Sequence, residues 1–179
     1  MHLYKGRLRS PFCVLVGLLY LHQMKEKAIT LRFLAEPVNV NFGGKVHGGS
    51  VMKWIDQAGY ACAANWCGGY AVTVYVGGIR FFKPMLIGYL VELRARLIHT
   101  GNSSMHISVD VFSKSPQSDD WVRNTHCVII FVSIDKDGKP TNVPTFSPET
   151  EEEIQMQKYA IRLMELRKGI EDEMEAYMS

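Results

Sequence analysis

The feature that most constrains the fold is a change in hydrophobic period at the glycine pair after Cys67. Before it, residues 50–66 place apolar side chains three and four positions apart, which is the period of one buried helix face. After it, four stretches alternate apolar and polar side chains, which is the period of a strand with one dry face. These stretches are residues 71–82, 89–99, 104–114 and 121–135.

A fifth strand is predicted over residues 28–36, where apolar and polar side chains alternate until Pro37 ends the run. The connections among the later strands are short and rich in turn residues, which favours antiparallel pairing. The sequence lacks the alternating strand and helix order of a parallel sheet. We therefore predict an α+β fold, in which an antiparallel five-stranded sheet wraps around one central helix and a C-terminal helix follows.

The predicted central helix, residues 50–66, is expected to be buried along one face. That face is formed by Val51, Trp54, Ile55, Ala58 and Cys62. Small residues on the same helix would let a sheet approach it closely. The preceding segment, residues 39–49, contains four glycines, and we predict a shaped loop without regular structure there.

A second helix is predicted within residues 147–179. Thr150 and Glu153 have the spacing of a capping box at its start. Apolar side chains then form a seam near a seven-residue period, at Met156, Ala160, Leu163, Ile170, Met174 and Tyr177. This seam must pack against another surface, which can belong either to its own domain or to a partner subunit.

Residues 1–24 are predicted to be an extension outside the fold. Lys5, Arg7 and Arg9 precede an apolar run over residues 11–21, as in a secretion signal, but no small-residue cleavage site follows. An apolar run of this length is too short to span a bilayer. An extension without a role, an interfacial anchor and a targeting segment all stay open. The predicted division is 1–24 for the extension, 25–146 for the main domain and 147–179 for the C-terminal helix.

Charge is distributed unevenly along the chain, although the formal net charge is only +2. Residues 1–148 carry 16 Lys and Arg against 9 Asp and Glu, whereas residues 149–179 carry 4 against 9. The net charge is too small to suggest a nucleic-acid partner. The basic body fits either a phosphate-bearing ligand or an ordinary solvated surface.

The spacing of cysteines and histidines indicates no metal site. The cysteines, Cys13, Cys62, Cys67 and Cys127, form no CxxC pair, and the histidines form no HExxH motif. We expect buried free thiols in a reducing compartment. The expected protein is therefore cytoplasmic, with no metal and no membrane span.

The candidate chemistry lies at the start of the central helix. His47, Gly48 and Gly49 precede the helix, and Asp56 follows about two turns later. The first amides of a helix lack internal partners, and paired glycines let a ligand oxygen reach them, so a developing oxyanion would be stabilised there. Asp56 is expected beside the buried stripe, where a carboxylate is costly unless it has a task. It could activate a water molecule or attack directly.

The residues around this pattern resemble a known family. Residues 41–56 are similar to the signature of the hotdog-fold acyl-CoA thioesterases, in the group of bacterial short-chain and brain-type cytosolic enzymes. The similarity covers roughly residues 25–165. It continues in residues 72–74, 79–84, 101–105 and 137–144.

The resemblance implies hydrolysis of acyl-CoA to a free fatty acid and CoA, without a cofactor. Asp56 would be the general base or nucleophile, and Asn41 would position the water or the thioester. The Gly49 amide would polarise the thioester carbonyl, and His47 would shape the loop.

The same resemblance implies a substrate-binding set, with Arg80 and Lys83 as phosphate partners. The set is Gly48, Thr73, Arg80, Phe82, Lys83, Pro84, Gly101, Asn102, Ser103 and Ser104. The family also implies a homodimer whose sheets join edge to edge, with sites between protomers, and commonly a hexamer built as a trimer of dimers.

Two other functions use the same fold. A non-catalytic acyl-CoA-binding sensor or regulatory subunit would bind ligand without releasing thiol, although it would not need the acid. Dehydration of a hydroxyacyl thioester usually needs a histidine paired with an acid, and nothing in the sequence gives His47 more than a positioning role.

Overall fold

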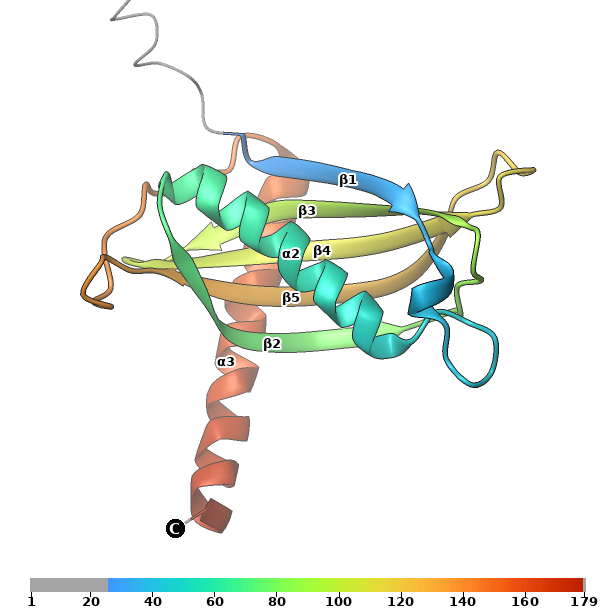
Figure 1. Cartoon of the computed structure of the whole chain (residues 1–179). Helices are drawn as coiled ribbons and strands as arrows, with labels where there is room; N and C mark the ends of the chain where they lie inside the picture. The colour runs from blue at the N-terminus through green and yellow to red at the C-terminus, as the bar shows by residue number, and fades with distance from the viewer. Residues whose placement is uncertain (1–25, 179) are drawn as a thin grey trace, which may run out of the picture.

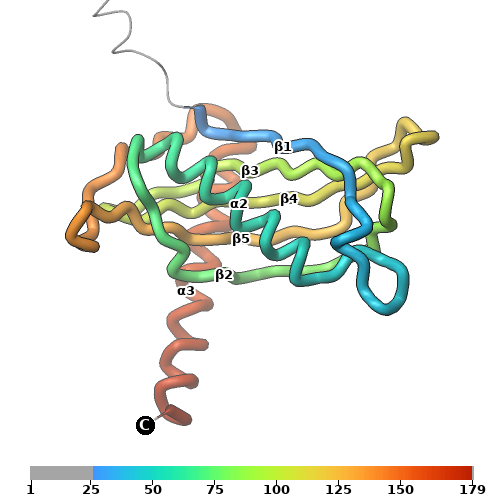
Figure 2. The backbone as a smooth tube through the Cα atoms, in the orientation of Figure 1, coloured from blue at the N-terminus to red at the C-terminus, as the bar shows by residue number. Residues whose placement is uncertain are grey.

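The computed structural model describes residues 26–178 (Figure 1). The predicted extension and Cys13 lie outside the described residues, so the alternatives for residues 1–24 stay predictions. The described part is a five-stranded sheet with a long helix on each face (Figures 1 and 2). The predicted α+β hotdog arrangement is confirmed.

Every neighbouring pair of strands is antiparallel, and the strand order is β1, β3, β4, β5, β2. The strands are β1 (Ala28–Leu34), β2 (Ala71–Phe81), β3 (Leu90–Thr100), β4 (Ser104–Lys114) and β5 (Val122–Ser133). The predicted ends agree to within two residues. The first strand ends early because Pro37 begins a one-turn 3₁₀ helix, Pro37–Asn39. The two edges of the sheet are β1 and β2.

Helix α2 (Gly48–Cys67) lies across one face of the sheet and forms the core with it. The predicted stripe, from Val51 to Cys62, is buried as expected. The small residues have the predicted effect. A side chain at Gly59 would lie 2.9 Å from atoms of Ile129 and Phe131, so the helix could not sit this close to β5 with a larger residue there.

The prediction of a loop through residue 49 is wrong at its end. Gly48 and Gly49 are the first residues of α2. Glycine is tolerated in the first turn because His47 caps the helix, accepting the Gly49 N–H through its side chain. The chain therefore becomes helical two residues earlier than glycine content suggested.

Helix α3 (Glu151–Met178) begins with half of the predicted capping box. Thr150 Oγ1 accepts the Glu153 N–H at 3.2 Å. The Glu153 carboxylate accepts the Glu149 N–H at 2.6 Å, one residue before the predicted partner. Lys27, next to β1, pairs with both Glu149 and Glu153, so the start of α3 is fixed to the start of β1.

The apolar seam of α3 divides into a packed half and an open half. Met156, Ala160 and Leu163 pack against Ile98 and Val128 on the sheet face opposite α2. Beyond them the helix crosses behind the sheet and projects past β2 (Figure 1). Ile170, Met174 and Tyr177 are there 54%, 54% and 88% exposed. Packing on its own domain is thus confirmed for the first half of the seam only.

The described cysteines Cys62, Cys67 and Cys127 are free. Burial raises the pKa of the Cys62 and Cys127 thiols to about 12, which keeps them protonated and unreactive. Among residues 26–178, no helix is both long enough and apolar enough to cross a membrane.

Candidate active site

Asp56 lies on α2 and faces the start of the edge strand β2. Thr73 Oγ1 donates a hydrogen bond of 2.6 Å to Asp56 Oδ1. Asp56 borders the buried stripe of α2 but is exposed in the single chain, so the expected cost of burying its carboxylate does not arise there. The reason is that this flank of α2 reaches the edge of the sheet, beyond which the chain offers no further strand. The carboxylate is oriented by one hydroxyl and still accessible to a water molecule.

The first two amides of α2 differ in their hydrogen bonding. Gly49 N–H donates to His47 Nδ1 at 2.9 Å, and His47 is therefore a helix cap. A side chain at Gly49 would lie 3.1 Å from the same nitrogen, so a larger residue there would need the His47 ring to shift. Gly48 N–H makes no hydrogen bond to another residue within the range 26–178. The helix terminus therefore offers one open donor and one that His47 occupies.

Asn41 organises the loop before the helix. Its Oδ1 accepts the N–H groups of Gly43 and Lys45 at 2.8 and 3.1 Å, and its backbone N–H donates to Lys45 O at 2.7 Å. The side-chain oxygen is thus committed to the loop. The amide nitrogen of the Asn41 side chain is left to donate to a ligand.

A pocket of about 300 Å³ opens beside the first turn of α2. The predicted residues Gly48, Phe82, Lys83 and Pro84 all line it. The rest of its wall is Val46, Val51, Phe81, Met85 and Thr125. A second pocket, of about 560 Å³, shares Lys83 and Pro84 and continues along the surface toward Lys114. The wall is mostly apolar with a cation at its mouth, which suits an apolar chain that ends in phosphates.

Two guanidinium groups stack near one exposed ring at this mouth. Arg80 and Arg123 lie 5.6 and 5.5 Å from the centre of the Phe82 ring. Arg123 also pairs with Asp110. The cations predicted at residues 80 and 83 are therefore accompanied by a third, which comes from the neighbouring strand β5.

Comparison with known proteins agrees with this geometry. The family model of the Thioesterase superfamily matches residues 43–119. The acyl-CoA thioester hydrolase YciA of Salmonella typhimurium is 34% identical over 119 residues, which are 65% of this chain and 90% of the relative. The chain belongs to the hotdog-fold acyl-CoA thioesterases.

Solved structures of similar thioesterases cover most of the chain. The acyl-CoA hydrolase from Staphylococcus aureus, solved in complex with butyryl coenzyme A, coenzyme A and coenzyme A disulfide, is 25% identical with a TM-score of 0.79. That match covers 87% of this chain and 94% of the other. A hexameric broad-specificity acyl-coenzyme A thioesterase, solved as an Asp-to-Ala mutant, is 30% identical with a TM-score of 0.62, covering 74% and 95%.

The remaining predicted residues of this thioesterase lie at the other end of the sheet. Residues 101–104 form the turn between β3 and β4, beside Ser133 at the end of β5. Phe82 lies beside Asn124, at the opposite end of β5. Within one chain, the structure therefore does not bring Gly101, Asn102, Ser103 and Ser104 together with the pocket.

Two neighbouring residues of β5 at the thioesterase pocket were not predicted from the sequence. Asn124 Nδ2 donates to the carbonyls of Lys83 and Pro84 at 3.3 Å each, and so holds the segment that lines both pockets. Thr125 is fully buried and lines the smaller pocket, and its Oγ1 has no hydrogen-bond partner within residues 26–178. Neither residue belongs to a recognisable motif, and only strand register places them here. Among the described residues, no three His, Cys, Asp or Glu side chains gather to hold a metal ion.

Proposed function

We propose that this thioesterase hydrolyses acyl-CoA to a free fatty acid and CoA, with Asp56 as the general base. The observation that carries the proposal is the hydrogen bond from Thr73 to Asp56, on the helix whose N-terminus borders the pocket. The Salmonella relative is named an acyl-CoA thioester hydrolase, and the Staphylococcus aureus hydrolase binds butyryl coenzyme A.

The distances within one chain require a second subunit. Eight residues separate Gly48 from Asp56, which is about 12 Å along a helix axis. One thioester cannot contact both groups of the same chain. The edge strand β2 has unpaired backbone groups, and its Val74 and Val76 are 53% and 43% exposed. We infer that two copies pair antiparallel through β2, which removes this edge.

Antiparallel pairing through β2 assembles a complete site. Thr73, which holds Asp56, lies near the start of β2, and Phe81, which lies beside Gly48, ends the strand. A two-fold axis at Gly77, midway between them, sets Thr73 opposite Phe81 of the partner subunit. Asp56 then faces the helix N-terminus of the partner, and its exposure in the single chain is accounted for.

The same pairing unites the two halves of the predicted CoA site. Residues 101–104 lie at the Thr73 end of the sheet, and residues 82–84 lie at the Phe81 end. The two-fold axis brings the turn of one subunit to the same end of the joint sheet as the partner's pocket. Arg80, Lys83 and Arg123 supply the charge for the phosphates.

The proposed chemistry is a single attack by water. Asp56 accepts a proton from the water as its oxygen bonds to the thioester carbon, and the carbonyl oxygen gains negative charge. The Gly48 amide of the partner subunit stabilises this oxyanion, joined by the Gly49 amide once the oxygen replaces His47 Nδ1 as its acceptor. The carbon–sulfur bond then breaks, and the CoA thiolate takes up the proton that Asp56 accepted, which restores the carboxylate. Asn41 positions the reactants through its side-chain nitrogen.

Residue spacing supports this assignment. Solved alanine variants of the Staphylococcus aureus hydrolase alter an aspartate, an asparagine 15 residues before it and a threonine 17 residues after it. The chain described here has Asn41, Asp56 and Thr73 at the same spacings. The hexameric relatives support assembly of the proposed dimers into a trimer of dimers.

The proposal is tested by thiol release from acyl-CoA substrates of two to eighteen carbons. We expect one free thiol per acid formed, and Asp56→Asn should lower kcat about 10²- to 10⁴-fold with an unchanged circular dichroism spectrum. Asp137→Asn, in the exposed turn after β5, is the matched control. Tight acyl-CoA binding without thiol release at every chain length would instead identify a sensor, and full activity of Asp56→Asn would refute the assigned base.

A further inference from the structure

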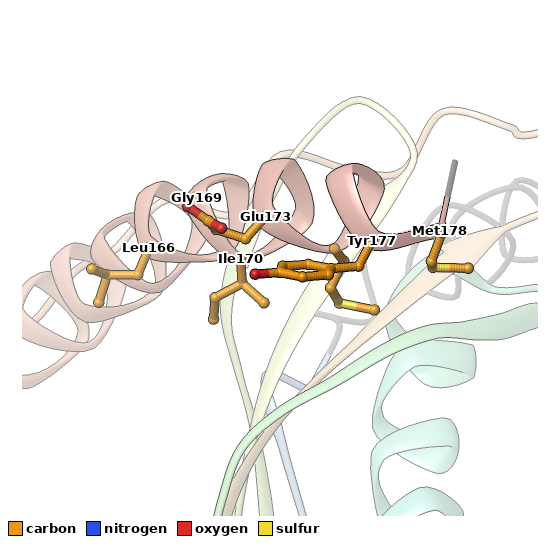
Figure 3. A pocket seen from close by; sticks show the side chains of 7 residues that line it. Leu166, Gly169, Ile170, Glu173, Tyr177 and Met178 are labelled. Carbon is orange, nitrogen blue, oxygen red and sulfur yellow. The ribbon is translucent and has the colours of Figure 1, made fainter.

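The exposed half of α3 carries an apolar flank that its own domain does not cover. Figure 3 shows Leu166, Ile170 and Tyr177 on one side of the helix, with Glu173 and Gly169 along the same stretch. Leu166 and Ile170 are 51% and 54% exposed. Three turns of helix with large apolar side chains in water are costly, which indicates a protein surface opposite them.

The place where α3 crosses the sheet identifies that surface. The helix passes over the middle of the edge strand β2, where Arg167 stacks over the Tyr75 ring at 4.9 Å. Leu163, Leu166 and Arg167 share a pocket of about 230 Å³ with Gly77 and Gly78 of that strand. Gly77 is also the position of the two-fold axis in the proposed active dimer. Ile170 also lines this pocket, so in the proposed active dimer the part of α3 beyond Ile170 would extend over the partner.

We propose that the second half of α3 packs antiparallel against α3 of the partner subunit and clasps the dimer. The inference rests on the proposed pairing through β2, which it deepens by adding a second interface. Because the axis lies near Leu166 and Arg167, these turns of the two helices meet each other. The tail from Gly169 onward then lies beside the earlier turns of the partner's helix.

Charge favours the antiparallel orientation. The tail contains Glu171, Asp172, Glu173 and Glu175 and no basic residue. Residues 158–168 contain Lys158, Arg162, Arg167 and Lys168 against one acid, Glu165. Within the same helix, Arg162 pairs with Glu165 and Arg167 with Glu171. An antiparallel pair sets the acids of each tail against the bases of the other helix. A parallel pair would set acids against acids. Gly169 has open space where a side chain would be, which permits close approach of the helices.

The first test is sedimentation equilibrium of the full-length protein. Ile170→Asp changes both copies of the interface, and we expect the dimer dissociation constant to rise at least about 100-fold. Ile161→Asp is the matched control, since Ile161 is 42% exposed on the other side of the helix. An equal effect of both variants, or none of Ile170→Asp, would overturn the proposal. Circular dichroism of each variant verifies that α3 stays helical.

The second test is disulfide trapping, which does not depend on activity. Leu166→Cys lies near the axis and should form a reducible covalent dimer under mild oxidation, above the background of the native cysteines. Glu173→Cys lies on the same flank but far from the axis, and should not. Covalent dimers with both variants would indicate parallel helices. If neither variant forms a covalent dimer, the two helices do not contact each other. Both outcomes reject the clasp while leaving thiol release and the Asp56 assignment untouched.

Discussion

At the scale of the residue, His47 is a structural cap as well as a proposed site residue. Its imidazole accepts the Gly49 N–H at 2.9 Å. Removing a capping side chain typically costs about 1 kcal/mol. We therefore expect His47→Ala to lower the free energy of unfolding by about 1 kcal/mol, and His47→Asn, which can still cap, to lower it much less. Urea unfolding of both variants measures the difference, and equal losses would contradict the cap.

In the proposed mechanism, Thr73 positions the carboxylate of Asp56 without taking part in the reaction itself. Because one oxygen of Asp56 is held only by this hydroxyl among the described contacts, its loss should leave the base misoriented. We expect Thr73→Val to lower kcat about tenfold with little change in KM, and Thr73→Ser to restore it. Steady-state kinetics separates this from a binding role, in which KM would rise instead.

The site was predictable from sequence at this scale only where a residue belongs to a motif. His47, Gly48, Gly49 and Asp56 form an ordered pattern that points to oxyanion chemistry. Asn124 and Thr125 have no such pattern, since what they do depends on the strand beside them. The partner of Gly49 N–H was also not predictable, because it depends on the rotamer of His47.

At the scale of the element, the sheet face beneath α3 carries buried titratable groups. Burial lowers the pKa of His106, on β4, from 6.5 to about 4, and the neighbouring His99 and Arg167 act in the same direction. The unfolded chain therefore binds more protons than the folded one between about pH 4 and 6.5. Stability should fall as the pH falls through that window, and should gain nothing further above it.

His106→Leu should flatten this part of the pH dependence, because leucine fills the apolar site without titrating. A smaller slope of stability against pH should remain, because burial also lowers the pKa of His99. Below about pH 4, stability should keep falling as the pH falls. Burial raises the pKa of Glu92 and Asp110, but hydrogen bonds from arginines and from His126 outweigh it, so both pKa values are lower in the folded chain. Thermal unfolding midpoints across pH 3 to 8 provide the measurement, and a slope unchanged by His106→Leu would contradict it.

Elements were predicted well where one periodicity held over several turns or pleats. The bounds of β4 agree with the predicted stretch, since polar and apolar side chains alternate from Ser104 to Val111 and the pattern breaks only at the register shift beside Phe112. The start of α2 was misplaced because glycine content argues against a helix, whereas a cap and packing of the following turns override it. The α3 seam was found, but its periodicity could not show where the sheet beneath it ends.

At the scale of the whole molecule, the proposed site is divided between two chains, and this can be tested by complementation. Asp56→Asn and Gly48→Val each disable both sites of a homodimer. In a mixed dimer, one site combines an intact Asp56 from one chain with an intact Gly48 from the other. Co-expression in equal amounts should therefore recover about a quarter of the wild-type activity, since half of the dimers are mixed.

The two variants purified separately and assayed in the same tube, without exchange of subunits, are the control. Recovery in the co-expressed sample alone would place Asp56 and Gly48 of one site on different subunits. A co-expressed sample as inactive as the control would mean that each site uses one chain only, and would refute the division.

The sequence by itself determined the order of helix and strands, the buried stripe of α2, and the pairing of a glycine-rich helix start with one acid. These follow from local periodicity and from the chemistry of single residue types, which neighbours in the chain already specify. Tertiary structure decided that Asp56 lies at an open sheet edge and that residues 101–104 lie far from residues 82–84. It also decided that α3 extends past the edge of its own sheet. Those facts depend on which strands end up at the edge and on how far each element extends past it, and no local pattern encodes a distance across a sheet.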